Sequence, residues 1–263
     1  MQWTRVDTAK GTSCRVLTGG PDGGEPVVFF HGAGGLMEPD RFLERLAERY
    51  SVFAPEMPGY GESTGEDLLE DMLDFTLHGW DLVDALGVDR PHLVGHSMGG
   101  MIASEMACVC PARPRRLALV APAGLWIDEH PIADIFGVLP HDLPAMLFAD
   151  PAAGAAALTQ GADFSDMDAL VAFFIDNARR LGTAGKILFP IPNRRLSKRL
   201  YRLRAPALVV WGEEDRLIPP LYADRWLELV PSAELVTVAA AGHMAPLEQP
   251  DAVADAVLKF LEV

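Results

Sequence analysis

The sequence is poor in cysteine: among 263 residues there are three, Cys14, Cys108 and Cys110. Cys108 and Cys110 stand two apart in a segment with a helical pattern, so their side chains do not face each other. An odd count without paired CxxC spacing favours neither a disulfide framework nor a zinc site. We therefore expect reduced, buried thiols and no bound metal.

Long apolar runs are also missing. No stretch reaches the ~18 uninterrupted apolar residues of a membrane-spanning helix. The first residues, Met1–Asp7, lack the continuous apolar core of a signal peptide. We therefore expect a cytoplasmic protein without membrane attachment.

Basic residues are outnumbered. Lys and Arg total 22 against 37 Asp and Glu, which gives a formal net charge of −15. Such an acidic surface repels phosphate backbones and anionic headgroups, so nucleic acid is not an expected partner. Hydrophobic residues make up 49% and charged residues 22% of the chain. That balance suits a globular protein with one large core and one sizeable insertion.

Short apolar and β-branched runs recur along the chain, and several are apolar throughout. Such runs suit strands of a parallel sheet that are buried on both faces. The first two runs are separated by a short turn and are expected to be antiparallel. The predicted strands are Trp3–Val6, Ser13–Leu17, Pro26–His31, Ser51–Pro55, His92–Gly95, Arg116–Ala121, Ala207–Trp211 and Glu234–Val238.

Helical patterns lie between many of these runs. We predict helices over Asp40–Tyr50, Glu66–Leu86, Ser97–Cys110 and Asp251–Leu261. Strands that alternate with helices indicate right-handed crossovers and a doubly wound α/β fold.

One region breaks this alternation. Residues 122–204 show helical stretches and scattered phenylalanines without a convincing strand. We interpret them as a helical cap, or lid, inserted into a core domain formed by residues 1–121 and 205–263.

The pattern Gly-x-Ser-x-Gly occurs twice, around Ser63 and around Ser97. Its chemical meaning depends on a strand that runs into a sharp turn and then a helix, which exposes the serine at the edge of the sheet. Ser63 follows a turn sequence and stands three residues before Glu66, which is the spacing of a helix N-cap. Ser97 follows an apolar strand and precedes a helical segment. Ser97 is therefore the candidate nucleophile.

A serine hydroxyl needs a positioned base and an acid that orients the base. His243 lies just beyond the last predicted strand, where it is expected to overhang the same sheet edge as Ser97. Asp215 follows the preceding strand, with Glu213 and Glu214 as nearby competitors. The spacing alone leaves the choice among these three acids open.

A loop rich in glycine, His31–Gly35, follows another buried strand. Main-chain N–H groups in such a loop can approach a developing oxyanion. We expect the N–H groups of Met98 and Ala33 to be the donors, with Gly34 as a possible replacement for Ala33.

Together these segments resemble the α/β-hydrolase superfamily, in its serine-nucleophile branch. The segments that carry the resemblance are His31–Gly35, Pro58–Ser63, Gly95–Gly100, Gly212–Asp215 and Gly242–His243. The resemblance implies an eight-stranded, mostly parallel sheet flanked by helices, a helical cap between strands 6 and 7, and no cofactor. It also assigns the acid of the triad to Asp215, in the order Ser97, Asp215, His243.

The family includes carboxylesterases, enol-lactone hydrolases and meta-cleavage-product hydrolases, all similar to this chain. We expect hydrolysis of a small or medium carboxylic ester or lactone, a small-molecule acyl substrate, by a monomer or homodimer. Cap residues expected to line an apolar pocket are Trp126, Phe136, Leu139 and Met146.

Two alternatives stay open. One is carbon–carbon bond hydrolysis of a substrate that bears a carboxylate, which needs a cation in the site. The candidates for that cation are Arg179, Arg180, Arg194 and Arg195. The other is a non-catalytic ligand receptor that uses a pocket of the same kind.

Overall fold

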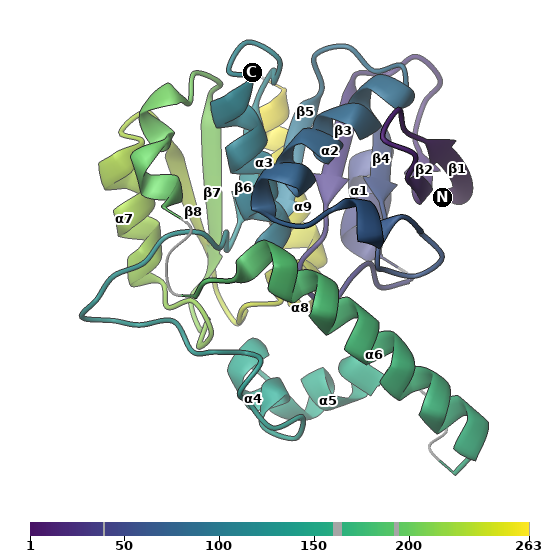
Figure 1. The fold of residues 1–263 in the computed structure, drawn as a ribbon. Helices are drawn as coiled ribbons and strands as arrows, with labels where there is room; N and C mark the ends of the chain where they lie inside the picture. Colours follow the sequence, from purple (N-terminus) through teal and green to yellow (C-terminus); the bar gives the residue numbers. More distant parts are fainter. Residues whose placement is uncertain (39, 160–164, 192–194, 263) are drawn as a thin grey trace.

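A computed structural model of the protein describes residues 1–38, 40–159, 165–191 and 195–262. The described residues form an eight-stranded sheet in the order β1-β2-β4-β3-β5-β6-β7-β8 (Figure 1). β2 pairs antiparallel with β1 and with β4, and the remaining pairs are parallel. The expected mostly parallel sheet is therefore confirmed. The strands are β1 (Gln2–Asp7), β2 (Ser13–Gly19), β3 (Pro26–Phe30), β4 (Ser51–Pro55), β5 (His92–His96), β6 (Leu117–Val120), β7 (Ala207–Gly212) and β8 (Glu234–Val238).

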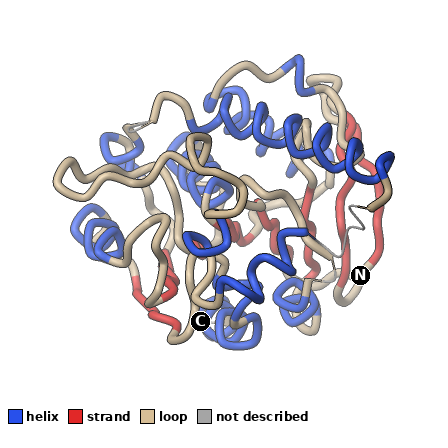
Figure 2. The backbone as a smooth tube through the Cα atoms, turned by 90° about the horizontal axis from the view of Figure 1, so that it is seen from below, coloured by secondary structure: helices blue, strands red, loops and turns tan. Residues whose placement is uncertain are grey.

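Helices cover both faces of this sheet, and Figure 2 shows the strands lying between them. The period-2 alternation of a strand sends neighbouring side chains to opposite faces. Val28 and Phe30 accordingly join the apolar cluster that includes α2 and α3, and Val27 and Phe29 join the cluster that includes α1 and α9. The helices of the core are α1 (Arg41–Ala47), α2 (Met72–Ala85), α3 (Met98–Val109), α7 (Leu221–Leu229), α8 (Ala245–Glu248) and α9 (Pro250–Leu261).

The helix predicted over Glu66–Leu86 is wrong at its start. The segment forms a short 3-10 helix, η1 (Glu66–Leu68), and α2 begins only at Met72. The side chain of Asp71 caps α2 by accepting hydrogen bonds from the N–H groups of the next turn.

The N-cap role predicted for Ser63 is also wrong. Ser63 is fully buried, and its Oγ accepts a hydrogen bond from the main-chain N–H of Arg15 at 2.8 Å. Its hydroxyl therefore satisfies a donor of β2 and caps no helix.

Between β6 and β7 the chain forms α4 (Leu143–Leu147), α5 (Pro151–Thr159), α6 (Met167–Leu188) and the 3-10 helices η2 (Leu196–Lys198) and η3 (Leu200–Arg202). Figure 1 shows α4, α5 and α6 outside the layers of sheet and flanking helices. We refer to residues 122–204 as the cap segment. That these residues form a domain separate from the core stays a prediction.

The carboxyl-terminal half of α6 is fastened to the core. Arg179 forms an ion pair with Glu66 and donates hydrogen bonds to the carbonyls of Gly61 and Ser63. Lys186, about two turns further along α6, donates to the carbonyls of Glu66 and Leu69. These contacts fix α6 beside the loop that follows β4.

None of the helices in the described part of the chain combines the length and the apolar character that a membrane span requires.

Candidate active site

Ser97 occupies the sharp turn between β5, which ends at His96, and α3, which begins at Met98. Its backbone has φ 53° and ψ −117°, a conformation that non-glycine residues rarely adopt. The flanking glycines are needed because the chain is crowded: a Cβ on Gly99 would overlap the carbonyl of Phe30. The pentapeptide therefore folds as the strand–turn–helix that its sequence indicated.

Two further loops bring His243 and Asp215 to this turn. Nε2 of His243 lies 2.8 Å from Oγ of Ser97, and Nδ1 of the same ring lies 2.8 Å from Oδ2 of Asp215. The exposed fractions of Ser97, Asp215 and His243 are 8%, 3% and 2%. The three side chains thus form one buried hydrogen-bonded chain.

The direction of the protons follows from the partners of Asp215. Its other oxygen, Oδ1, accepts hydrogen bonds from the N–H groups of Leu217 and Ile218 at 2.9 and 2.8 Å. When it is ionised, Asp215 can only accept hydrogen bonds, so the contact between its Oδ2 and Nδ1 of His243 requires a proton on Nδ1. Nε2 of His243 is then an acceptor, and the hydroxyl of Ser97 donates to it.

The competing acids point elsewhere. Glu213 and Glu214 are exposed, and Glu214 forms an ion pair with Arg216 at 3.2 Å. The geometry therefore places Asp215, and neither glutamate, against the imidazole.

The glycine-rich loop His31–Gly35 lies directly beside Ser97, the candidate nucleophile. A Cβ built on Gly32 would stand 3.4 Å from Cβ of Ser97. Ala33 and Gly34 line the same cavity as Ser97. Met98 is the first residue of α3, where main-chain N–H groups have no acceptor within the helix.

His31 holds this loop in place. Its Nε2 accepts from the N–H of Met57 at 3.1 Å, so Nδ1 carries the proton and donates to the carbonyl of Gly32 at 2.7 Å. Burial lowers the pKa of His31, which keeps the ring neutral. The carbonyl and the N–H of a trans peptide point in opposite directions. The N–H of Ala33 therefore points away from His31.

His96, the residue before Ser97, contacts the loop that carries His243. Its Nε2–H donates to the carbonyl of His243 at 2.8 Å. Burial lowers the pKa of His96 to about 3, so the ring is neutral at physiological pH. Sequence reasoning missed this contact, because it joins residues that are far apart in the chain.

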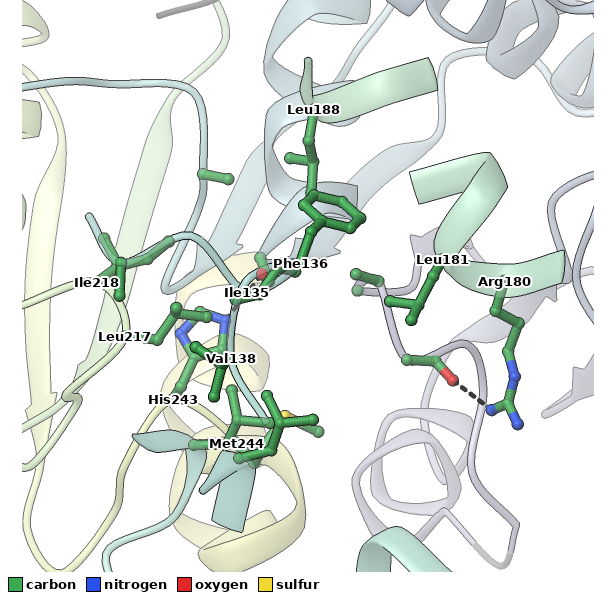
Figure 3. A pocket seen from close by; sticks show the side chains of 18 of the residues that line it. Ile135, Phe136, Val138, Arg180, Leu181, Leu188, Leu217, Ile218, His243 and Met244 are labelled. Atoms are coloured by element: carbon green, nitrogen blue, oxygen red, sulfur yellow. Dashed lines mark hydrogen bonds between the residues drawn. The ribbon is translucent and has the colours of Figure 1, made fainter. Parts of the chain in front are cut away.

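A cavity of about 320 Å³ opens in front of Ser97 and His243. Its walls come from the core loops and from the cap segment, and most of them are apolar (Figure 3). Apolar residues of the lining include Met37, Met101, Leu125, Trp126, Ile132, Ile135, Phe136, Val138, Leu143, Leu147, Leu158, Phe173, Phe174, Leu181, Leu188, Ile191, Leu217, Ile218 and Met244.

Two of the four predicted cap residues are in this wall and two are not. Trp126 and Phe136 line the cavity. Leu139 is 58% exposed to solvent, and Met146 packs against the core cluster that contains α2 and α3.

Arg180 brings a cation to the cavity. It lines the wall and donates to the carbonyl of Gly34 at 2.9 Å (Figure 3). It also pairs with Asp176, one turn earlier on α6. Its buried Nε has no hydrogen-bond partner among the described residues. Arg179 instead faces the core, Arg195 precedes η2, and Arg194 lies outside the described residues.

In the residues that the structure describes, no three His, Cys, Asp or Glu side chains are grouped so that they could hold a metal ion.

Comparison with known proteins agrees with this fold. A model of the alpha/beta hydrolase family matches residues 27–256. The 2-hydroxy-6-oxo-6-phenylhexa-2,4-dienoate hydrolase of Burkholderia cepacia is 29% identical over 259 residues, which cover 90% of this chain and 88% of that protein. The dihydrolipoyllysine-residue acetyltransferase component of the acetoin cleaving system of Pseudomonas putida is 32% identical over 251 residues, or 92% of this chain. The chain spans only 65% of that relative's length.

Solved structures are similar over the whole chain. A membrane phospholipase A superposes with a TM-score of 0.80 at 25% identity and covers 99% of this chain, and 86% of that chain is matched. A carboxylesterase of Bacillus subtilis gives a TM-score of 0.74 at 22% identity, with 99% and 91% of the two chains covered. At 22% identity, the likeness to the carboxylesterase shows a shared fold.

Proposed function

The chain belongs to the alpha/beta hydrolase family of enzymes, and from this premise we propose that it hydrolyses a small or medium carboxylic ester or lactone through an acyl-enzyme on Ser97. The hydrogen-bonded chain from Ser97 Oγ through His243 to Asp215, with both distances at 2.8 Å, carries the proposal.

In the first half of the proposed reaction, His243 removes the proton of Ser97 as its Oγ attacks the acyl carbon. Asp215 holds the imidazole in the Nδ1–H form and stabilises its positive charge. The imidazolium then protonates the leaving alcohol. In the second half, the same histidine deprotonates a water molecule, which attacks the acyl-enzyme and releases the acid.

The tetrahedral intermediates place negative charge on the former carbonyl oxygen. We assign its stabilisation to the N–H groups of Met98 and Ala33. The geometry favours Ala33 over Gly34, because His31 and the N–H of Gly35 both hold the carbonyl of Gly32 and so orient the N–H of Ala33. Loss of one oxyanion donor typically costs ~3–4 kcal/mol of transition-state stabilisation.

The apolar cavity supports this substrate class. A volume of about 320 Å³ with mostly apolar walls suits an acyl group of small to medium size. Trp126 and Phe136 contribute large apolar surfaces from the cap segment.

A panel of p-nitrophenyl esters of increasing acyl length tests this function on the wild type and on Ser97→Ala. We expect turnover by the wild type and a loss of at least ~10³-fold in kcat for the variant. Equal turnover by both proteins, or tight binding of acyl compounds without any turnover, would contradict the proposal.

A second candidate function keeps the same triad and cleaves a carbon–carbon bond in a vinylogous diketone acid. Arg180 favours it, because a guanidinium with an unpartnered Nε lines the cavity. A relative named as a 2-hydroxy-6-oxo-6-phenylhexa-2,4-dienoate hydrolase adds support.

The colour of a ring-cleavage product distinguishes the two functions. Decay of that colour without ester turnover would favour carbon–carbon hydrolysis. In that case Arg180→Gln should lower kcat/KM for the acidic substrate by at least about tenfold, because a charged hydrogen bond is lost. Ester turnover that is indifferent to Arg180→Gln would favour the first function.

A further inference from the structure

Glu248 joins the loop of the proposed base to the cap segment. One carboxylate oxygen, Oε2, accepts a hydrogen bond from the main-chain N–H of Gly242 at 2.7 Å. The other, Oε1, accepts from the main-chain N–H of Ala149 at 2.7 Å. Gly242 directly precedes His243, and Ala149 lies between α4 and α5. One side chain thus holds two segments that are nearly a hundred residues apart.

The main chain on the other side of His243 is held by the same part of the cap segment. The N–H of Met244 donates to the carbonyl of Leu147 at 3.1 Å. Gly242 packs closely on the end of α4: a Cβ added to Gly242 would stand 2.7 Å from the carbonyl oxygen of Leu147. The residues before and after His243 therefore both have their N–H groups bound, directly or through Glu248, to the junction of α4 and α5.

The loop that carries Asp215, the acid of the proposed triad, also contacts this part of the cap segment. Arg216, next to Asp215, donates from its guanidinium to the carbonyls of Ala145 and Phe148 at 3.1 and 3.0 Å. The junction of α4 and α5 consequently contacts both loops that carry the base and its acid.

From these contacts we propose that Glu248 is a positioning residue, which sets the place of the His243 imidazole by binding the base loop to the cap segment. The proposal rests on the proposed function, since it assigns Glu248 an effect on the reaction through His243. Glu248 contacts neither the Ser97 hydroxyl nor the imidazole itself, so it takes no part in proton transfer.

The energetic reason is that both hydrogen bonds are charge-assisted, which makes them shorter and stronger than neutral ones. Without the carboxylate, the N–H of Gly242 loses its acceptor in a crowded, partly buried site. The base loop then relaxes, and Nε2 of His243 moves relative to Oγ of Ser97. Misplacement of a catalytic group by ~1 Å is enough to cost ~10²-fold in rate.

Glu248→Gln tests the proposal with little change in shape, because the amide keeps one acceptor and places an NH₂ group against the second N–H. Glu228→Gln is the matched control: it removes a carboxylate from the exposed face of α7, where Glu228 pairs only with Arg225 among the described residues. We expect Glu248→Gln to lower kcat for the best p-nitrophenyl ester by ~10- to 100-fold with KM within about threefold. The control should behave like the wild type.

Two further readouts separate positioning from a loss of stability. Covalent labelling of Ser97 by a fluorophosphonate should slow in proportion to kcat. The low-field proton resonance of the His243–Asp215 hydrogen bond should shift or broaden in Glu248→Gln at a temperature well below its Tm. If Glu248→Gln does not fold, Glu248→Asp, which keeps both oxygens on a shorter stem, should show the same changes to a smaller extent.

The positioning role would be overturned if a folded Glu248 variant kept the kcat, the labelling rate and the proton resonance of the wild type. If Ser97→Ala were inactive at the same time, the proposed function would still stand. An equal loss in Glu228→Gln would also overturn it, since the cause would be net charge. Full activity of Ser97→Ala would remove both proposals together.

Discussion

The Nε2–H of His96 donates a hydrogen bond to the carbonyl of His243 across 2.8 Å, so the residue before the proposed nucleophile holds the main chain of the proposed base. Strand β5 thereby helps to position both Ser97 and His243, the first through the turn that follows the strand and the second through His96. The separation of the Ser97 hydroxyl and the His243 imidazole therefore depends in part on this hydrogen bond between the His96 side chain and the main chain of His243.

We predict that His96→Phe lowers kcat about tenfold. Phenylalanine fills the same space but cannot donate to the carbonyl of His243, and the loss of one buried hydrogen bond costs on the order of 1 kcal/mol or more. Steady-state kinetics with a p-nitrophenyl ester measures the effect. His96→Gln, which keeps an N–H donor, should retain more activity than His96→Phe; the reverse order would argue against this role.

Tyr222 fastens the wall of the cavity. Its buried hydroxyl accepts from the N–H of Ile127 at 3.0 Å and donates to the carbonyl of His130 at 2.8 Å. We predict that Tyr222→Phe raises KM for the longer acyl substrates several-fold and leaves kcat nearly unchanged, because the wall loosens while the triad stays intact. A drop in kcat at unchanged KM would show that the loop acts on the chemistry instead.

A buried histidine far from the site makes stability depend on pH. His78 has no exposed surface, its Nε2 bonds to Oγ1 of Thr12 at 2.8 Å, and burial lowers its pKa from 6.5 to about 4. Between those values the unfolded chain binds a proton that the folded chain does not bind. The free energy of unfolding should therefore fall as the pH drops from 6.5 to 4, in total by roughly 3 kcal/mol from this residue.

Urea denaturation at a series of pH values measures that slope, and His78→Gln should flatten it. His141, whose side chain is 75% exposed, supplies the control variant His141→Gln. Equal slopes in the wild type and in His78→Gln would contradict the assignment.

The contact between α6 and the core depends on a glycine. Gly59 has φ +93°, and a Cβ there would overlap the hydroxyl of Thr183 on α6. We predict that Gly59→Ala lowers the free energy of unfolding by more than the ~1–2 kcal/mol of left-handed strain alone. Gly87→Ala is the matched control, because Gly87 has φ +68° with no atom within 4 Å of the added Cβ. Similar losses in the two variants would show that the contact with Thr183 tolerates the extra methyl group.

Local patterns predicted the sheet well, because the central strands β3, β5, β6 and β7 are apolar runs buried almost throughout, and the outer strands are short β-branched runs bounded by turns. β4 and β8 begin and end at the predicted residues. The strand–turn–helix around Ser97 was also readable, since glycines on both sides of a serine after an apolar strand have few other uses.

The errors come from places where tertiary contacts override a local pattern. Ser63 and Glu66 have the spacing of a capping box, yet the hydroxyl of Ser63 satisfies the main chain of β2 instead. Leu139 looked like pocket lining by its side chain alone, and only the path of the cap segment turns it to solvent.

The contacts of His96 and Glu248 gave no signal in the sequence. Each is a hydrogen bond between a side chain and the main chain of a distant segment. Main-chain partners leave no trace in residue type, so such contacts are visible only once the fold is known.

The central claim is that Ser97 is the nucleophile, and covalent labelling tests it most directly. The wild-type protein is treated with a fluorophosphonate, digested, and the modified peptide is mapped by mass spectrometry. Attachment to Ser97, abolished in Ser97→Ala, is the predicted result. Attachment at Ser63 or at any other residue, or no labelling at all, would contradict the account.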